Sequence, residues 1–402
     1  MPDFGLLVPG APGMAEALTD DVAMLRALLE AEVAWVQAQA HLGTVPPAQA
    51  DLISQAAQNL ADDSEITELA KQTAEAGALG GNPVIPLIGF LRVEAKAVAG
   101  DDSLTKVIHT GLTSQDVHDT ALVLVLKKAG SQILAALDTA IGATAALAEQ
   151  HRDTPLLART LAQAAVPTTF GAKFAVWLTA LAHTRANLAT VLAGLPVSYG
   201  GAGGELGGYV QRAPDGDAFQ LVQAWADQLG LIVTANPWHV TRLPFMEIAS
   251  ALAQLCAVTG HIANDVLQAA RPGIYELAEP AAQGRGVSSS MAHKRNPVLS
   301  ILLKRTAIAA PALLGQVYTA AGLAVDERPD GAWHAEWPAL QQLARYGVSA
   351  ANAAAELLSG LEVNTENAAA NLAAALPDLT LELAQPPATT AELVTRALAS
   401  VG

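Results

Sequence analysis

The sequence predicts an all-α protein whose centre is a bundle of very long helices. Four long stretches run apolar with few helix-breaking residues, at 121–148, 156–194, 243–271 and 297–325. Hydrophobic residues make up 51% of the chain and charged residues only 15%, so much of the helical surface should be buried between helices or subunits. No convincing series of strands, internal repeat or low-complexity linker interrupts this pattern.

The N-terminal quarter of the chain predicts shorter helices. Residues 14–43 are predicted to form one helix, because Asp20 and Asp21 suit its dipole-positive start and a glycine followed by two prolines marks its end. Residues 47–79 are predicted to form shorter helices. The glycine- and proline-rich segment 80–86 is predicted to be a turn into another helix.

The central part of the chain begins with the longest predicted helix. A helix of about 35 residues that starts at Asp116 would be roughly 50 Å long at 1.5 Å per residue. Residues 156–194, 243–271 and 297–325 are predicted to form further long helices, and residues 195–208 a glycine-rich loop. No predicted strand precedes this loop, so it lacks the context of a nucleotide-binding glycine loop.

These elements predict three domains. The polar segment 101–106 closes a small N-terminal helical domain at 1–106. The long helices form a central domain at 107–345. Residues 346–402 are predicted to be a short C-terminal domain of short helices, with a last helix after a pair of prolines.

Composition excludes several classes of protein. The net charge of −16 argues against a nucleic-acid partner, and any anionic substrate needs a local cluster of the 22 Lys and Arg residues. The single cysteine, Cys256, excludes an internal disulfide and favours a reducing cytoplasm, and the first residues lack the pattern of a secretory signal.

The uncharged run 306–325 is long enough to span a bilayer. Pro311, Gly315 and Gln316 interrupt it, so a buried bundle helix is expected there instead of a membrane span.

Two polar segments in the first half of the chain are candidate parts of a binding site. Residues 113–115 are placed at the start of the longest helix, where a helix cap is the structural alternative to an anion site. The second polar segment covers residues 159–163 and 167–171, and its structural alternative is an ordinary loop before a helix.

The third polar segment, residues 284–297, has the sequence G-R-G-V-S-S-S-M-A-H-K-R-N-P. Its small residues let backbone N–H groups face a ligand, and its serines can transfer a proton. Its lysine and asparagine can hold an anion. Pro297 permits the helix that is predicted to start at Val298. A polar surface loop of the same composition is the structural alternative.

This third segment resembles the signature loop of the fumarase/aspartase superfamily, G-S-S-x-M-P-x-K-x-N-P. The positions that match are Ser288, Ser289, Met291, Lys294, Asn296 and Pro297. Val287 replaces the second glycine of the family motif and Ala292 its first proline, so the chain departs from the family at two positions that affect loop mobility. The resemblance includes all three polar segments, in order, over nearly the whole chain. It implies a three-domain all-α fold and a homotetramer in which three different subunits contribute to each active site.

Leu161 distinguishes between members of this superfamily that the chain could resemble. Adenylosuccinate lyases and their relatives carry a histidine in R-T-H-x-x-x-A, and this chain has Leu161 at that place. Such a histidine assists a basic leaving group, an effect typically worth about 10²–10⁴-fold. A carboxylate needs no such help, because its conjugate acid has a pKa of about 4. The leucine therefore favours chemistry in which the leaving or attacking group is a stable anion.

Further motifs resemble the 3-carboxy-cis,cis-muconate cycloisomerases. They are G-G-N-P-V-I-P-L at 80–87, P-W-H at 237–239 with Arg242, and G-A-W-H-A-E-W at 331–337. Asp326 departs from that family, which has a histidine there, and the chain is shorter than many relatives. The resemblance implies closure of 3-carboxy-cis,cis-muconate to a carboxymuconolactone, a step of protocatechuate degradation in the β-ketoadipate pathway. In this step a carboxylate oxygen adds across a conjugated double bond.

The resemblance also implies roles for individual residues. Ser288 would transfer the proton at carbon, and Lys294 and Asn296 would hold the carboxylate where negative charge develops. The other predicted substrate-binding residues are Thr113, Ser114, Gln115, Arg159, Thr160 and Gln163, with His109, Arg242, His293 and Arg328 as weaker candidates that could equally be structural. The implied partner is a small polycarboxylate substrate. No metal or organic cofactor is implied, and no Cys/His cluster has metal-ligand spacing.

Other functions remain open at the level of sequence. Another lyase that expels a stable anion, of the nitrosuccinate type, would tolerate Leu161. An adenylosuccinate-type lyase is disfavoured by Leu161 and by the lack of an added phosphate site. A non-catalytic structural homologue is disfavoured by the retention of Ser288, Lys294 and Asn296. A helical scaffold for protein partners has the least support.

Overall fold

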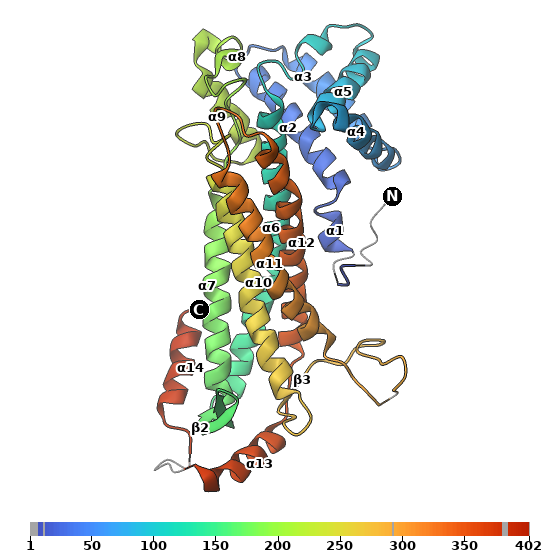
Figure 1. The fold of residues 1–402 in the computed structure, drawn as a ribbon. Coiled ribbons are helices and arrows are strands. Elements are labelled where there is room, and N and C mark those ends of the chain that lie inside the picture. The colour runs from blue at the N-terminus through green and yellow to red at the C-terminus, as the bar shows by residue number, and fades with distance from the viewer. Residues whose placement is uncertain (1–6, 11–12, 292, 380–384, 402) are drawn as a thin grey trace.

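The protein is a bundle of long helices with smaller helical parts at its two ends (Figure 1). This computed structural model describes all residues except 1–6, 11–12, 292, 380–384 and 402. The long helices are α6 Ser114–Gln150, α7 Phe170–Ala193, α10 Leu243–Ala269, α11 Val298–Gly322 and α12 Gly331–Ser359. The predicted all-α class is confirmed, because helices dominate the described residues and the strands are few and short.

The N-terminal part packs beside one end of the bundle (Figure 1). Its elements are α1 Met14–Ala17, α2 Asp21–His41, α3 Pro47–Leu60, α4 Ile66–Gly80, α5 Val84–Ala99 and a 3₁₀ turn at Leu104–Lys106. The single helix predicted for 14–43 is wrong, because the chain breaks between α1 and α2. Asp20 caps α2 by accepting the Ala23 backbone N–H at 2.7 Å, a geometry in which Asp20 itself is extended and not helical.

Helix α6 confirms the longest predicted helix, since it runs for 37 residues without a break. Its first turn is held by Asp116, whose carboxylate accepts the Thr113 backbone N–H at 2.8 Å. This is half of a capping box, which satisfies amide groups that a helix start otherwise leaves without partners. The helix therefore begins at residues 113–114, slightly earlier than predicted.

A β-hairpin replaces the start of the long helix predicted for 156–194. Strand β1 Pro155–Thr160 pairs antiparallel with β2 Gln163–Thr169, and α7 starts only at Phe170. The two residues between the strands, Leu161 and Ala162, have φ of 51° and 65°, as a two-residue hairpin turn requires. The prediction was wrong because this turn lacks the Asn-Gly or Gly-Gly pair that usually marks such a conformation.

The second half of the chain contains the remaining elements. They are α8 Gly207–Val210, a 3₁₀ turn at Pro214–Gly216, α9 Ala218–Leu229, β3 Leu277–Ala278, β4 Glu362–Val363, α13 Thr365–Ala375, a 3₁₀ turn at Leu376–Asp378 and α14 Thr389–Ala399. Helix α10 and helix α11 pack closely at Gly260, where an added Cβ would lie 2.2 Å from the Ala307 Cβ. The predicted boundary between the central and C-terminal domains, after residue 345, lies inside helix α12, which continues to Ser359. We therefore propose that the C-terminal part begins after Ser359.

Helices α6, α10 and α11 are each long and apolar enough to cross a membrane by length and composition. In the most apolar window of each, 67%, 61% and 28% of the residues are buried, respectively. The helix predicted at 306–325 is part of α11 and packs in the bundle against α10 and α12, but within one chain it is only partly buried. Pro311 lies inside α11 without ending it.

His118 lies in the core between α6 and α12, where its imidazole stacks on Trp337 with 4.0 Å between ring centroids. Burial lowers the pKa of His118 from 6.5 to about 4. The negative charge of Asp119 opposes this shift, while Arg242 and His334 add to it. The imidazole is therefore neutral at physiological pH.

We expect His118 to make the protein less stable as the pH falls from 6.5 towards about 4. In this window the unfolded chain binds a proton that the folded chain does not, so the free energy of unfolding decreases with decreasing pH. Between pH 7 and pH 5 the loss should be about 2 kcal/mol. His118→Phe keeps an aromatic ring and should remove this loss, as measured by denaturant unfolding at both pH values. An equal loss in the two proteins would contradict the expectation.

Candidate active site

The three polar segments lie at separate places on one chain. Residues 113–115 begin α6 and residues 159–163 follow its other end. The 37-residue helix between them is about 55 Å long at 1.5 Å per residue. Residues 284–297 precede α11 and extend sideways from the bundle as the orange loop in Figure 1. One chain does not bring the three segments together, so a site that contains all of them needs more than one copy.

The serine loop, residues 284–297, is closed at its base by Gly286 and Asn296. The backbone N–H and the side-chain amide of Asn296 donate to the Gly286 carbonyl at 2.8 and 3.2 Å. Gly286 has φ of 68°, and a Cβ there would lie 2.4 Å from the Asn296 carbonyl oxygen, so only glycine fits. Of the two departures from the family motif, Val287 is exposed and Ala292 lies outside the described residues.

Ser288 lies near the tip of the serine loop. Its Oγ accepts the backbone N–H groups of Ser290 and Met291, at 3.4 and 3.1 Å. Donors that face an oxygen stabilise negative charge on it. The neighbouring side chains of Ser289, His293 and Lys294 are exposed. The loop therefore presents a hydroxyl and a lysine ammonium to whatever lies opposite it.

A carboxylate that the sequence analysis missed links the serine loop to α11. Glu279 accepts the backbone N–H groups of Leu299 and Ser300 at 3.0 and 2.6 Å. The predicted start of this helix after Pro297 is confirmed. Because Glu279 occupies the positive end of the helix, this helix start is not free to bind a substrate anion.

The hairpin tip separates Arg159 from its polar neighbours. Arg159 donates two hydrogen bonds to the Glu276 carboxylate, each at 2.8 Å. Thr160 and Gln163 are exposed at the tip, and Leu161 between them is 98% exposed. The tip thus projects a leucine and two polar side chains away from its own chain, while Arg159 is held at the base by an ion pair.

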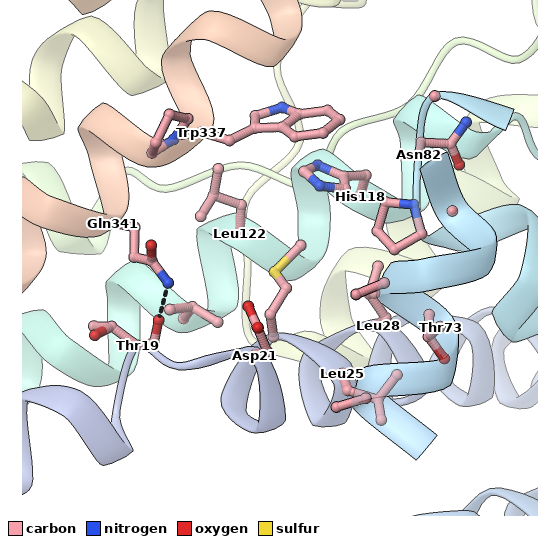
Figure 2. Close-up of a pocket in the computed structure, with 18 of the residues that line it drawn as sticks. Thr19, Asp21, Leu25, Leu28, Thr73, Asn82, His118, Leu122, Trp337 and Gln341 are labelled. Atoms are coloured by element: carbon pink, nitrogen blue, oxygen red, sulfur yellow. Dashed lines mark hydrogen bonds between the residues drawn. The ribbon is translucent and has the colours of Figure 1, made fainter. Parts of the chain in front are cut away.

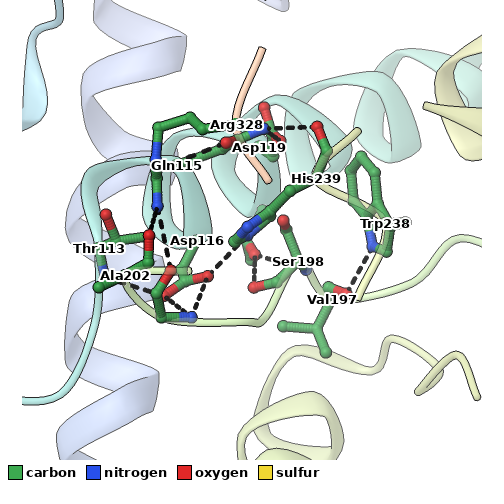
Figure 3. Close-up of polar contacts among 12 residues, drawn as sticks. Thr113, Gln115, Asp116, Asp119, Val197, Ser198, Ala202, Trp238, His239 and Arg328 are labelled. Atoms are coloured by element: carbon green, nitrogen blue, oxygen red, sulfur yellow. Dashed lines mark hydrogen bonds and ion pairs between the residues drawn. The ribbon is translucent and has the colours of Figure 1, made fainter. Parts of the chain in front are cut away.

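Gln115 and Arg328 join the start of α6 to the glycine-rich loop at 200–204 (Figure 3). Gln115 is buried, and its amide donates to Asp119 at 3.1 Å and to the His239 carbonyl at 2.9 Å. Arg328 donates to the Gln115 Oε1 at 3.5 Å and to two loop carbonyls at 3.1 and 2.7 Å. Gln115 and Arg328 therefore hold the backbone at His239 and in the glycine-rich loop in place. Thr113 and Ser114 are only half-buried, so they lie nearer to solvent.

Asp116 lies at the centre of this arrangement, and it was not among the predicted site residues. Besides the Thr113 amide, its carboxylate accepts the His239 Nε2–H at 2.8 Å and the Gly201 N–H at 3.2 Å (Figure 3). Asp116 and His239 are both buried. They fix the position of the first turn of α6 relative to the glycine-rich loop.

Arg242 is buried in an ion-pair network and is only 1% exposed. It pairs with Asp119 through two N–H groups, at 2.6 and 3.1 Å, and with Glu336 through its Nε and one terminal nitrogen. Trp333 donates to the same Asp119 at 2.8 Å. This is the ion-pair alternative that the sequence analysis left open for Arg242.

His109 also has a protein partner. Its Nδ1 lies 2.5 Å from the Glu32 carboxylate, and its backbone has φ of 62°. Burial of the imidazole works to lower the pKa of His109, but the hydrogen bond and charge of Glu32 outweigh it, so the pKa is raised. His109 lies just before the start of α6 and can carry a positive charge beside residues 113–115.

The described residues contain no group of three or more His, Cys, Asp and Glu side chains that could hold a metal ion. The polar partners that the sequence analysis missed are Glu32, Asp116, Asp119, Glu276, Glu279 and Glu336. The sequence feature that could have identified these carboxylates is their position within apolar helices, where charged residues are rare. A carboxylate within such a stretch usually has a buried partner.

Comparison with known proteins decides the family. Residues 10–310 match the sequence profile of a family described as lyase. This chain belongs to that lyase family. The lyase is 44% identical over 375 residues to the nitrosuccinate lyase of Streptomyces davaonensis, with 92% of this chain and 77% of the relative aligned. It is 38% identical over 370 residues to the 3-carboxy-cis,cis-muconate cycloisomerase of Bradyrhizobium diazoefficiens, covering 91% of this chain and 79% of the relative.

Solved structures agree with this assignment. The lyase superposes on the 3-carboxy-cis,cis-muconate lactonizing enzyme of Pseudomonas putida with a TM-score of 0.85, 29% identity and 96% of each chain covered. A fumarate lyase of Mesorhizobium matches with a TM-score of 0.76, 27% identity and coverage of 96% of this chain and 85% of the other. The predicted membership of the fumarase/aspartase superfamily is confirmed.

Proposed function

We propose that this lyase cleaves a substituted succinate by β-elimination and releases a stable anion, with nitrosuccinate as the first substrate to test. The products would be fumarate and nitrite. The geometry of Ser288 carries the proposal, because two backbone N–H groups face its Oγ at the tip of the serine loop. The 44% identity to a nitrosuccinate lyase supports this choice of leaving group.

In the proposed reaction Ser288, as an alkoxide, removes a proton from the carbon next to a substrate carboxylate. The two N–H groups at its Oγ favour the negative oxygen that this step needs. The electrons of the broken C–H bond move into the adjacent carboxylate, which becomes an aci-carboxylate. Lys294, exposed on the same loop, stabilises that charge. The electrons then form the carbon–carbon double bond as the C–N bond breaks, and nitrite leaves with the bonding pair.

Leu161 fits a leaving group that needs no proton. It lies exposed at the hairpin tip, where a histidine could act as a general acid. Nitrite is a weak base and departs as an anion. Thr113, Ser114, Gln115, Arg159, Thr160, Gln163, Asn296, His109, His293 and Arg328 remain proposed contacts or supports of the substrate-binding region. Arg242 is proposed to support the site through its ion pairs, since it is buried.

A second candidate is the cycloisomerase reaction on 3-carboxy-cis,cis-muconate. The observation that favours it is the superposition on the Pseudomonas putida lactonizing enzyme over 96% of each chain. In this direction Ser288 donates its proton to carbon after a substrate carboxylate oxygen has closed the ring. In both candidate reactions the group that leaves or attacks near Leu161 is a stable anion, either nitrite or a carboxylate oxygen. In both, negative charge develops on the substrate carboxylate near Lys294.

The test is to give purified protein each substrate separately. With nitrosuccinate we expect nitrite, measured by diazo coupling, and fumarate, measured by its ultraviolet absorbance, in equal amounts. With 3-carboxy-cis,cis-muconate the measured quantity is loss of the diene absorbance. Turnover of the muconate alone selects the second candidate. If a folded protein consumes neither compound, both proposals are wrong and a non-catalytic homologue becomes the better explanation.

We also propose a homotetramer in the cytoplasm with active sites shared between subunits. The separation of the three polar segments within one chain supports this, because each site needs all three. The open apolar surface of α11, where only 28% of the most apolar window is buried, would be covered by other copies.

A further inference from the structure

A pocket that contains none of the three polar segments lies between the N-terminal part and the bundle. Its volume is about 430 Å³, and its walls come from α2, α4, α6 and α12 (Figure 2). Most of its lining is apolar, with Leu25, Leu28 and Leu122 among the side chains drawn in Figure 2. A hydrogen bond from Gln341 to the Thr19 carbonyl at 2.7 Å closes one side.

His118 is one of the polar residues that line this pocket. It is 4% exposed, and its buried Nδ1 has no hydrogen-bond partner within the part of the chain that the structure describes. The Thr73 hydroxyl and the Trp337 indole N–H, both on residues that line the pocket, also lack partners among the described residues. Buried polar groups normally have partners, so three such groups around one pocket point to a missing one.

The charge of the lining excludes the proposed substrate from this pocket. Among the residues that line it there is no Lys or Arg, and Asp21 is the carboxylate present. A polycarboxylate would find no cation here and would be repelled by Asp21. The occupant must therefore be uncharged, largely apolar and able to make a hydrogen bond.

We propose that this pocket binds a neutral aromatic molecule of about two fused rings that carries one hydroxyl or N–H group, with the rings between the leucines and that group hydrogen-bonded to His118. The size follows from the volume, since a dry cavity of about 150 Å³ holds one benzene ring. In neutral imidazole each nitrogen is either a donor or an acceptor, and a hydroxyl can be either, so it can pair with the unpartnered Nδ1 in both tautomers. The proposal does not depend on the substrate of the lyase.

Three probes of one shape test the proposal by isothermal titration against the full-length protein. They are 2-naphthol, which is neutral with a hydroxyl, naphthalene, which lacks it, and 2-naphthoate, which is an anion. We expect 2-naphthol to bind with the lowest Kd, and the other two probes to bind about tenfold more weakly or worse. No binding of 2-naphthol up to its solubility, or tighter binding of 2-naphthoate, would overturn the proposal.

Variants locate the binding in this pocket. His118→Phe keeps the ring and removes the nitrogens, so 2-naphthol should lose about tenfold in affinity and match naphthalene. Ala74→Trp fills the pocket from an exposed lining position on α4 and should abolish binding of both neutral probes. The matched control is Leu79→Trp on the same helix, since Leu79 is 95% exposed and does not line the pocket. Unchanged binding in Ala74→Trp, or equal loss in both tryptophan variants, would place the site elsewhere and refute the proposal.

Discussion

Arg242→Met should lower the free energy of unfolding by about 3–5 kcal/mol, because it leaves two buried carboxylates without their cation. Arg242, Asp119 and Glu336 are each 1% exposed or less, so water cannot replace the lost ion pairs. The residues come from the start of α10, from α6 and from α12, and the network therefore joins three bundle helices. Denaturant unfolding at pH 7.5, at one fixed protein concentration, measures the loss.

The protonation states of Asp119 and Glu336 explain why Arg242 contributes so much to the free energy of unfolding. Burial raises the pKa of Glu336 to about 7 against the opposing charge of Arg242, and nearby Asp119 adds to the rise. Burial also acts to raise the pKa of Asp119, but Arg242 outweighs it and the pKa is lowered. A single cation cannot fully stabilise two buried anions, so Asp119 keeps its charge and Glu336 is the group that takes up a proton first. Without Arg242 both carboxylates would have to be neutral or solvated.

Two comparisons separate burial from simple charge loss. Arg185→Met removes an ion pair of similar length, 2.8 Å to Asp138, in which both side chains are more than a third exposed, and should cost less than about 1 kcal/mol. Adding Asp119→Asn and Glu336→Gln to Arg242→Met should recover part of the lost stability, since the stranded charges are gone. If Arg242→Met and Arg185→Met cost the same, the buried network does not hold these helices together.

The lengths of α6, α10 and α11 could be predicted because they depend on local pattern, whereas α12 was missed, since its second half was expected to be short helices. Helix α6 is apolar over most of its length and starts at a capping box, and α11 starts after Pro297 as expected. The hairpin could not be predicted in the same way. Its strands contain leucine, alanine and valine that suit a helix equally well, and Leu161 and Ala162 adopt positive φ without a glycine. Strand pairing, which is a tertiary property, decides that conformation.

For the candidate site as well, residues close together in the sequence could be predicted, and contacts between distant segments could not. The serine loop was found because its residues lie close together in the sequence, and the family motif singles out Ser288 and Lys294. Its carboxylate partners were missed because they arrive from distant segments. His239 and Asp116 are 123 residues apart, and Arg242 and Glu336 are 94 apart, so no local pattern pairs them. The sequence therefore yields a hypothesis for the chemistry of the site, and the structure adds the buried groups that hold its neighbouring residues in place.

Ser288→Ala should reduce kcat/KM on the productive substrate by about 10²–10⁴-fold, the usual size of a lost general acid or base. The change removes one hydroxyl and leaves the Gly286–Asn296 base of the loop untouched. Helix content and the midpoint of thermal unfolding should therefore stay the same. The matched control is Ser290→Ala on the same loop, whose side chain is exposed and should matter less than about tenfold. Similar losses in the two variants would remove Ser288 from its proposed role.

Co-expression of two differently impaired variants tests whether this serine acts on a site that another subunit completes. Arg159→Gln removes the charge at the hairpin but keeps a donor for Glu276, so it should fold. Co-expressed at equal amounts, Ser288→Ala and Arg159→Gln subunits should recover about a quarter of the natural activity, because half of the loops and half of the hairpins are intact and they combine at random. A site formed within one chain would recover nothing, since every chain carries a defect. Ser288→Ala mixed with Lys294→Ala provides the control, because both changes lie on one loop and no mixture restores it.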